Sequence, residues 1–253
     1  PRRGVAQPFI RPADVKSHRV YLPPLEEQRR IAGILDAADA LRRRRREALA
    51  LLDTLPGAIF AEMFGGRTRL EHREIGKLGR VVTGATPPSK KEDMFGGPIP
   101  FVTPGDLEGD GSTVRRLTQA GAQASRTVRG GSTLGCCIGA TIGKISQFNE
   151  SVAFNQQINA VEWGDEIEPA FGTQAMRLIK DKIIGSAKST TLPILKKSLF
   201  EKLLIPVASK GRQREFAGLV ESVEARKEPI KSQLYEIETL FASLQSRAFA
   251  GEL

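Results

Sequence analysis

The residue types that most often bind metals or form covalent intermediates are scarce in this sequence of 253 residues. The only cysteines are adjacent, Cys136 and Cys137, and the only histidines are His18 and His72. Adjacent cysteines rarely bond to each other, and with only two histidines besides them a structural zinc site would lack ligands. We therefore expect two buried free thiols, no disulfide framework and no metal site, in a reducing, cytoplasmic setting.

Two short patterns resemble enzyme motifs but lack the residues that would perform the chemistry. The series Gly135, Gly139 and Gly143-Lys144 is similar to a phosphate loop, yet Ile138 stands where a Walker loop needs its first glycine. We expect these glycines to form turns at strand edges. The string Thr86-Pro87-Pro88-Ser89 lacks the Asp or Asn and the aromatic residue of an amino-methyltransferase motif. We expect no cofactor and no catalytic residue in the chain.

Two segments show the periodicity of long helices. In both, apolar residues recur at steps of three and four, which favours packing of helix on helix. We expect residues 24–64 to run antiparallel to residues 207–249, with Pro56-Gly57 and Pro229 bending or interrupting the helices. The expected apolar stripes are Ile31, Ile34, Leu35, Ala38, Leu41, Leu49, Leu52, Leu55, Ile59 and Met63, and Phe216, Leu219, Val220, Val223, Ile230, Leu234, Ile237, Leu240, Leu244 and Ala248. We expect the basic run Arg42–Arg46 to be solvated, the alternative being contact with phosphate or an acidic partner.

The two helical segments are also an internal repeat. Residues 28–33, from Gln28 to Gly33, match residues 213–218, from Gln213 to Gly218, at an offset of 185 residues. The segment before the first helical segment thus corresponds to the end of the domain that precedes the second helical segment. We expect residues 1–23 to be the tail of an upstream domain and the chain to be a fragment or a processed form.

Residues 67–206 have a different texture, with short apolar runs between Gly, Pro, Ser and Thr. Strands are expected at residues 80–83, 99–102, 134–138 and 158–161, and a helix at residues 169–184. The expected fold class is α+β, a globular domain flanked by two long helices that pair as an antiparallel coiled coil. The expected domains are residues 1–23 (tail), 24–66 (central helical spacer), 67–206 (globular domain) and 207–253 (distal helical region).

The positive charge lies outside the helical segments. The chain has a net charge of +9. Residues 67–206 carry nineteen basic and fourteen acidic side chains, a net charge of +5, whereas residues 24–66 and 207–253 are each neutral. A basic surface attracts polyanions such as nucleic acid, although many ordinary soluble proteins are also basic. No run of eighteen apolar residues is present, so we expect no transmembrane helix.

Several motifs, taken in order, resemble the DNA-specificity subunits of type I restriction-modification systems. Leu22–Ala32 resembles the start of that family's conserved helical region. The motifs that resemble its target recognition domain are Gly84–Pro88, Gly97–Leu107, Ala140–Lys144 and Phe154–Ile158. The resemblance covers nearly the whole chain. It implies a non-catalytic subunit that reads one half of a bipartite target and positions the catalytic subunits.

The resemblance also implies the partners. These are double-stranded DNA, two methyltransferase (modification) subunits that bring S-adenosylmethionine, and a restriction subunit that brings ATP-driven cleavage. Within the helical region, Ile31 and Leu35 are the candidate partner contacts. Asn155, Gln156 and Gln157 lie in a motif shared across the family and are expected to be structural. The candidate DNA contacts are Lys90, Lys91, Arg115, Arg116, Arg126, Arg129, Lys144 and Lys188.

Other interpretations remain open from the sequence alone. The chain could be a coiled-coil scaffold or a protein-binding module without sequence-specific DNA binding. A catalytic role is disfavoured because the cofactor loop and an acidic metal cluster are missing. The chain could also be a natural half-subunit that pairs with itself. Sequence does not give the target bases or the spacer length.

Overall fold

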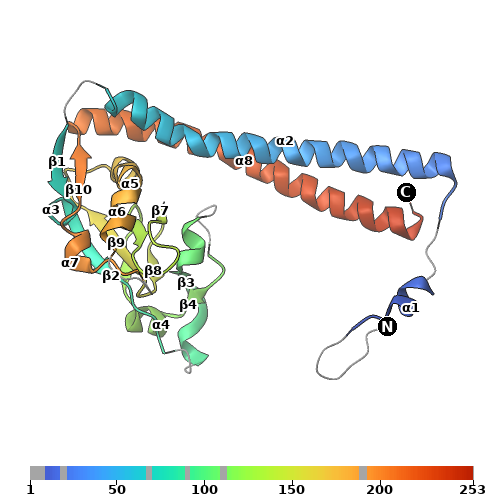
Figure 1. Ribbon diagram of the computed structural model, residues 1–253, viewed down its shortest axis with the longest axis horizontal. Coiled ribbons are helices and arrows are strands. Elements are labelled where there is room, and N and C mark those ends of the chain that lie inside the picture. The colour runs from blue at the N-terminus through green and yellow to red at the C-terminus, as the bar shows by residue number, and fades with distance from the viewer. Residues whose placement is uncertain are drawn as a thin grey trace. The chain divides into compact units, whose positions relative to one another are not determined.

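The computed structural model describes residues 9–17, 22–66, 70–88, 92–108, 113–187 and 193–252. The chain divides into two compact units, and the divisions fall within the two long helices. Unit 1 comprises the residues up to Asp53 together with Ala225 onward, and unit 2 is Thr54–Glu224. The two long helices are α2 (Leu25–Phe64) and α8 (Lys210–Ala250) (Figure 1). A mixed α+β fold with two long helices around a β domain is therefore confirmed.

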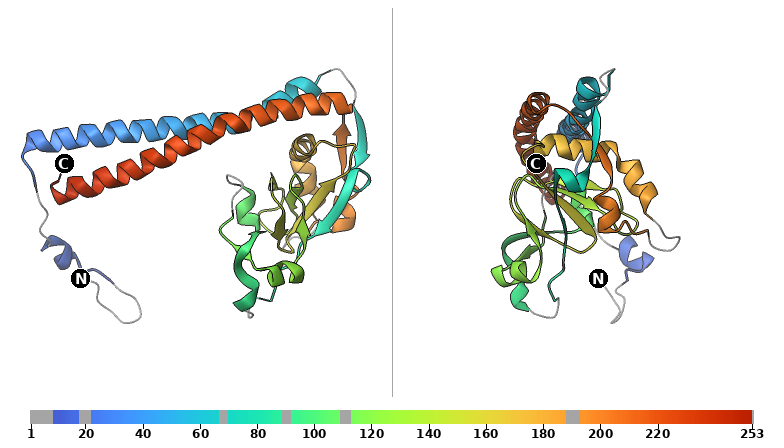
Figure 2. Two further views of the ribbon diagram at one scale, coloured as in Figure 1. Left: turned by 180° about the vertical axis from the view of Figure 1, so that it is seen from behind. Right: turned by 90° about the vertical axis from the view of Figure 1, so that its left-hand side faces the viewer.

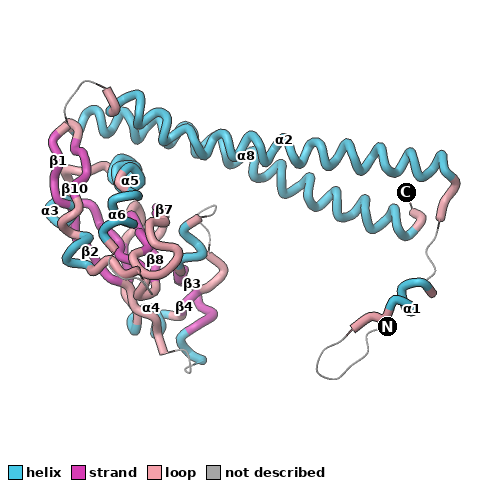
Figure 3. The backbone as a smooth tube through the Cα atoms, viewed as in Figure 1, coloured by secondary structure: helices cyan, strands magenta, loops and turns pink. Residues whose placement is uncertain are grey.

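Unit 2 contains three small sheets, which Figure 3 shows in magenta. The first is a two-stranded antiparallel ribbon, β1 (Glu71–Glu74) with β10 (Leu204–Val207). The second is antiparallel in the order β2-β9-β6-β7, with bounds Gly79–Thr83, Ile158–Trp163, Thr133–Cys136 and Ile145–Gln147. The third is mixed in the order β4-β3-β8-β5, with bounds Arg116–Leu117, Phe95–Val102, Val152–Phe154 and Thr127–Val128.

Short helices connect the strands. The expected strands at residues 80–83, 99–102, 134–138 and 158–161 correspond to β2, β3, β6 and β9. The helix expected at residues 169–184 is two helices, because Ile179 adopts a turn conformation between them. The helices are α1 (Pro12–Lys16), α3 (Ile75–Leu78), α4 (Gln119–Ala124), α5 (Pro169–Leu178), α6 (Lys180–Ser186) and α7 (Lys197–Phe200), with 3₁₀ turns η1 (Glu92–Met94) and η2 (Pro104–Leu107).

The alternation of side chains along β6 and β9 separates two cores. Successive strand residues point to opposite faces, so Leu134, Cys136, Ile158 and Ala160 share one face. They pack with residues of β3, β5 and β8, and this core lies between the two four-stranded sheets. The other face carries Val161 and Trp163, which pack with α5 and the adjoining ends of α2 and α8. Unit 2 is thus layered as helix, sheet, sheet (Figure 2).

A buried hydroxyl network ties this sheet to α5. The indole Nε1 of Trp163 donates to Oγ1 of Thr133 at 2.8 Å, and the hydroxyls of Thr133 and Thr173 are 2.6 Å apart. The Thr173 hydroxyl also bonds to Oε1 of Gln147 at 2.9 Å. Thr133 is fully buried, and its hydroxyl satisfies an indole N–H that would otherwise lose its water partner.

In unit 1 the two helices lie side by side, and the colours of Figure 1 show that they run antiparallel. Glu238 accepts from Arg46 at 2.5 Å, and Asp53 accepts from Lys227 at 2.6 Å. The residue numbers of the partners on α8 decrease as those on α2 increase, as they do in an antiparallel pair. Half-buried or buried residues recur at alternating steps of four and three, the period of a coiled-coil seam. They are Ile31, Leu35, Ala38, Arg42, Arg45, Leu49 and Leu52 on α2, and Lys227, Ile230, Leu234, Ile237, Phe241, Leu244 and Ala248 on α8.

Three basic side chains, Arg42, Arg45 and Lys227, lie in this seam. This corrects the expectation that the basic run Arg42–Arg46 is solvated. Arg42 was expected to be solvated, but its guanidinium lies 4.3 Å from the centre of the Phe241 ring. Lys227 is 8% exposed. Leu41 and Leu240, expected on the stripe, are 47% and 53% exposed. The long aliphatic stems of Arg and Lys cover apolar surface while their charged ends reach an acid or the solvent. These residues, and not Leu41 or Leu240, therefore stand at the positions that the spacing of four and three residues requires. In unit 2, Leu219 of the expected stripe is also exposed, at 43%.

The prolines do not end either helix. Pro56 is buried within α2 and Pro229 is exposed within α8, and both helices continue on either side. A proline removes one backbone hydrogen bond, and the bonds of the flanking turns keep the helix continuous. None of the described helices is both long and apolar enough to cross a membrane, since charged residues interrupt every stretch of α2 and α8.

The seam predicts that substitutions of two neighbouring leucines differ in their effect on stability. Leu52 is half-buried and Leu51 is 66% exposed. Leu52→Asp should lower the free energy of unfolding by about 2–5 kcal/mol, because it removes apolar contacts and buries a charge. Leu51→Asp should change it by less than about 0.5 kcal/mol. Thermal unfolding of both variants tests the pairing, and equal stabilities would contradict it.

The hydroxyl network predicts a second stability difference. Thr133→Val keeps the shape of the side chain but leaves Nε1 of Trp163 without an acceptor, which should cost about 1–3 kcal/mol. Urea unfolding can be followed through the fluorescence of Trp163, the only tryptophan. Thr127→Val, an exposed strand position, is the control. If the two variants unfold at the same urea concentration, the network does not contribute to stability.

Candidate nucleic-acid interface

The basic residues proposed as DNA contacts fall into three groups. Lys90, Lys91 and Lys188 lie outside the described residues. Arg115, Arg116 and Arg126 are exposed at the edges of the β4-β3-β8-β5 sheet. Arg129 and Lys144 have acidic or carbonyl partners elsewhere in unit 2. The structure thus brings together part of the predicted set.

Arg115 and Arg116 lie at one edge of this sheet, just before and at the start of strand β4. The guanidinium of Arg115 lies 5.9 Å from the centre of the Phe101 ring and 6.0 Å from that of Phe95, at the outer limit of a cation–π contact. The guanidinium of Arg116 donates to the carbonyl oxygen of Pro98 on β3. Neither contact neutralises the charge, so both remain available to an anion.

Arg126 lies at the opposite edge of the same sheet, immediately before β5. Its guanidinium donates to the carbonyl oxygen of Ser125 at 3.0 Å. Ser125 is buried, and its hydroxyl donates to the carbonyl oxygen of Ala85. These bonds fix the backbone that carries Arg126 and leave its charge exposed.

The other two described members of the candidate set, Arg129 and Lys144, have partners within unit 2. The backbone N–H of Arg129 donates to Glu162 at 3.1 Å, and its guanidinium donates to the carbonyl oxygen of Trp163. Nζ of Lys144 pairs with Glu108 at 2.8 Å, and this hydrogen bond lowers the pKa of the Glu108 carboxyl. Such partners are distant in sequence, so no local pattern indicates them. The ion pair favours a structural role for Lys144, whereas Arg129 is exposed and, like Arg116, donates to a backbone carbonyl that does not neutralise its charge.

Two of the sequence motifs pack against each other. A Cβ at Gly84 would lie 2.1 Å from the carbonyl oxygen of Asn155, so only glycine fits there. Thr86 donates from Oγ1 to Oε1 of Gln156 at 2.6 Å. Oδ1 of Asn155 accepts from the backbone N–H of Gln157 at 3.1 Å. Asn155 therefore shapes the turn before β9, in agreement with its expected structural role.

The glycine series and the cysteines also have structural roles. Gly139 and Gly143 adopt positive φ values of 88° and 85° in the connection from β6 to β7, as expected of turn glycines. Both cysteines are buried and free. Burial raises the pKa of the Cys137 thiol to about 12, so it stays protonated and unreactive at neutral pH. Among the described residues no cluster of three or more His, Cys, Asp or Glu side chains could hold a metal ion.

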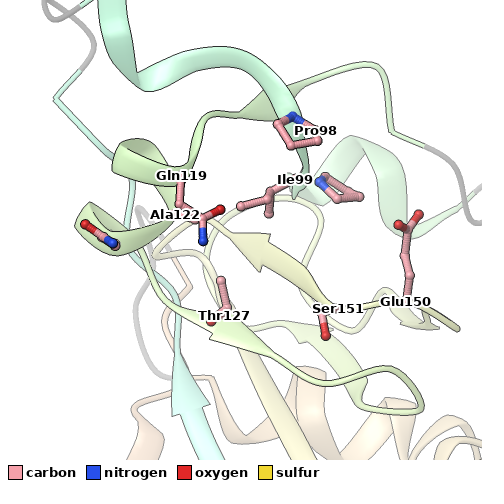
Figure 4. Close-up of a pocket in the computed structure, with 9 residues that line it drawn as sticks. Pro98, Ile99, Gln119, Ala122, Thr127, Glu150 and Ser151 are labelled. Carbon is pink, nitrogen blue, oxygen red and sulfur yellow. The ribbon is translucent and has the colours of Figure 1, made fainter.

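A cleft of about 480 Å³ opens between α4 and the strands of the mixed sheet (Figure 4). Its polar lining comes from Gln119 and Gln123 of α4, Thr127 of β5, and Glu150 and Ser151 before β8. Its apolar lining is Pro98, Ile99, Pro100 and Ala122. Sequence reasoning missed these residues because they are mostly neutral, lie in separate segments and form no recognisable spacing. Their amide, hydroxyl and carboxylate groups can donate and accept hydrogen bonds but form no nucleophile–base pair.

The candidate partner contacts Ile31 and Leu35 are half-buried positions of the helix seam in unit 1. The exposed side of the same turns carries Ala32 and Gly33. Apart from the helix's own backbone and adjacent residues, no atom lies within 4 Å of the place where a Cβ of Gly33 would stand. The same holds for Gly218, its counterpart in the repeat. Exposed glycine inside a helix costs about 1 kcal/mol relative to alanine, and no contact with the described residues requires it at either place.

Comparison with known proteins agrees with these features. The profile of a family described as "Type I restriction modification DNA specificity domain" matches residues 69–239. Among curated proteins the chain is similar to the "Type I restriction enzyme HindI specificity subunit" of Haemophilus influenzae, with 28% identity over 151 residues. That match covers 55% of this chain and 32% of the relative, so it spans about a third of the relative's length.

Solved structures share the fold. The HsdS subunit from Thermoanaerobacter tengcongensis matches with a TM-score of 0.53 and 22% identity, over 99% of this chain and 65% of that one. The S subunit from M. genitalium matches with a TM-score of 0.65 and 16% identity, over 98% and 67%. A structure titled as a type I R-M system matches with a TM-score of 0.60 and 23% identity, over 99% and 66%. Because the family profile covers well over half of the sequence, this chain belongs to the family of type I restriction-modification DNA specificity domains.

Proposed function

We propose that this chain recognises one half of a split DNA target within a type I restriction-modification complex, and that other subunits perform the methylation and cleavage. The observation that carries the proposal is the family profile, which spans residues 69–239 and so includes all three sheets of unit 2. The chain itself acts as a non-catalytic specificity subunit. Its buried, free cysteines suit a reducing cytoplasm.

Charge supports contact with DNA. Residues 67–206 have a net charge of +5, and Arg115, Arg116 and Arg126 are exposed on one small sheet. Phosphate contacts release bound cations from DNA, so binding by the assembled complex weakens as salt increases. Lys90, Lys91 and Lys188 complete the proposed set of phosphate or base contacts. Arg129 belongs to the same set, whereas Lys144 contributes chiefly through its ion pair with Glu108.

The repeat supports two equivalent docking places for modification subunits. Ala32-Gly33 on α2 and Ala217-Gly218 on α8 are related by the offset of 185 residues, and both glycines are exposed. An exposed helical glycine lets a partner's backbone approach closely. One modification subunit docks at each place, which gives two per chain. Ile31 and Leu35 support the first place by holding the helix beneath it.

The repeat also supports an upstream recognition domain. Nε2 of Gln213 donates to the carbonyl oxygen of Ala208 at 2.8 Å, and Nε2 of Gln28 donates in the same way to Pro23 at 2.7 Å. Gln213 additionally bonds Glu166 and Glu168 of unit 2. We assign residues 1–23 to the tail of a recognition domain whose corresponding loop would meet Gln28. That domain belongs either to the same chain or to a second copy.

A domain exchange tests the recognition proposal. Residues 67–200 are replaced by the same region of a related subunit, and the chimera is assembled with its modification subunits. The methylated half-site should change to that of the donor, while the spacer length stays the same because the helices are retained. Sequencing of methylated sites in a random DNA pool measures both. A chimera that still methylates the original half-site would show that this region does not read DNA.

Substitution of the exposed glycines tests the docking proposal. Gly33→Leu and Gly218→Leu should each remove one modification subunit, because the new side chain blocks close approach. The isolated chain should be as stable as the wild type or up to about 1 kcal/mol more stable. Mass measurement of the purified complex gives the number of subunits. Gly211→Leu, at another exposed helical glycine, is the control. Retention of both subunits in the two variants would exclude these surfaces.

A further inference from the structure

The cleft beside α4 has a composition suited to one class of ligand. Of its described lining residues, five are polar and one of these, Glu150, is charged. In Figure 4, Gln119 and Glu150 lie on opposite sides of Ile99. Gln119, Gln123, Thr127, Glu150 and Ser151 are all exposed, so their hydrogen-bonding groups are not used up by a core. The cleft therefore presents hydrogen-bond donors and acceptors beside apolar surface.

Edges of DNA base pairs match this lining group for group. A glutamine amide can bond N6 and N7 of adenine together, a carboxylate accepts from the N4 amino group of cytosine, and hydroxyls bond to several bases. An apolar floor such as Ile99 with Pro100 suits the methyl group of thymine. Small-molecule pockets are instead enclosed, whereas this cleft is open.

The flanking cations fit the same ligand. Arg116 bonds Pro98, which lines the cleft, and Arg126 directly precedes Thr127, which also lines it. These arginines belong to opposite edges of the β4-β3-β8-β5 sheet. In a DNA groove the base edges are bordered by phosphates on both sides, and phosphates position a protein while bases determine its specificity. The cleft between the two edges therefore has cations near both of its borders.

Glu150 distinguishes base contact from binding to phosphate alone. A carboxylate repels phosphate, so Glu150 would weaken a surface that bound only the DNA backbone. A carboxylate facing a base edge instead gains a hydrogen bond from cytosine and rejects bases without an amino group at that position. The position of Glu150 is thus informative about which part of the DNA it meets.

We propose that this cleft is the base-reading site of the chain. Glu150 accepts a hydrogen bond from a cytosine amino group, and Gln119 and Gln123 contact adenine. Arg115, Arg116 and Arg126 hold the bordering phosphates. This inference rests on the proposed recognition of DNA and assigns it to particular side chains.

The test uses the chain assembled with its modification subunits and a random DNA pool, from which bound sequences are selected and counted. Glu150→Gln should lower the preference for cytosine at one position of the half-site by about 5- to 150-fold and raise that for adenine. Gln119→Ala and Gln123→Ala should relax the preference for adenine at other positions of the same half-site. Arg115→Ala with Arg116→Ala should weaken binding to all sequences by similar factors.

Matched controls are Asp181→Asn on α6 and Gln233→Ala on α8, which make comparable changes at exposed positions outside the cleft. Both should keep the wild-type preference. Because the altered side chains are exposed, the melting temperatures of all variants should equal that of the wild type, which separates a change in recognition from a change in folding.

Two outcomes overturn the inference, and they differ in their consequence for the function. If the three cleft variants keep the wild-type preference at every position while the exchange of residues 67–200 changes the half-site, DNA is read elsewhere in that region. If neither the cleft variants nor the exchange changes the half-site, the recognition proposal fails as well. A changed preference at one position in Glu150→Gln, with unchanged controls, supports the cleft.

Discussion

Four phenylalanine rings hold together the places where the chain enters and leaves unit 2. Phe60 and Phe64 come from the end of α2, Phe171 from α5, and Phe216 from the start of α8. Their ring centres lie between 4.9 and 6.4 Å apart, several in edge-to-face geometry. Aromatic contacts of this kind add to the large apolar area that each ring buries. Without this cluster the two helices would not start from one fixed base on the β domain.

The cluster works with a buried amide. Gln213 is 1% exposed, and its side chain bonds three backbone groups, those of Glu166, Glu168 and Ala208. It thereby fastens the first turn of α8 to the loop before α5. An apolar contact allows a helix to slide or rotate, whereas directional hydrogen bonds fix its register. The fixed register of this turn determines which side of α8 carries Ala217 and Gly218.

Stability and proposed recognition reside in different residues. The rings, the hydroxyl network and Gln213 are buried, whereas the lining of the cleft beside α4 is largely exposed and contributes little to packing. Substitutions in the cleft are therefore tolerated by the fold, while those in the layers beneath are not. A family that must recognise many different sequences with one architecture benefits from this separation.

The architecture could be predicted from the sequence because local periodicity determines the helices and strands. The steps of three and four gave the two helices, and short apolar runs gave β2, β3, β6 and β9. The sequence was not sufficient for side chains whose partners are distant. Arg42 lies on Phe241 in the seam, and Lys144 is held by Glu108, because of contacts that no local pattern records. The cleft was missed for the same reason, since Gln119 and Glu150 come to line one cleft only when β3, β5 and β8 assemble.

The pairing of β1 with β10 has a consequence for how the protein is made. Glu71 lies opposite Val207, so β1 cannot form its hydrogen-bonded pair until β10 has been synthesised. During synthesis from the N-terminus, Ile75 and Leu78 emerge early, but Ile205 and Phe216, which belong to the same core, emerge only at the end. Contacts of such long sequence separation form slowly, and the apolar surface stays open meanwhile. Unit 2 therefore completes this core only after Phe216 has been synthesised, and a ribosome that stalls before Val207 leaves β1 without its partner strand.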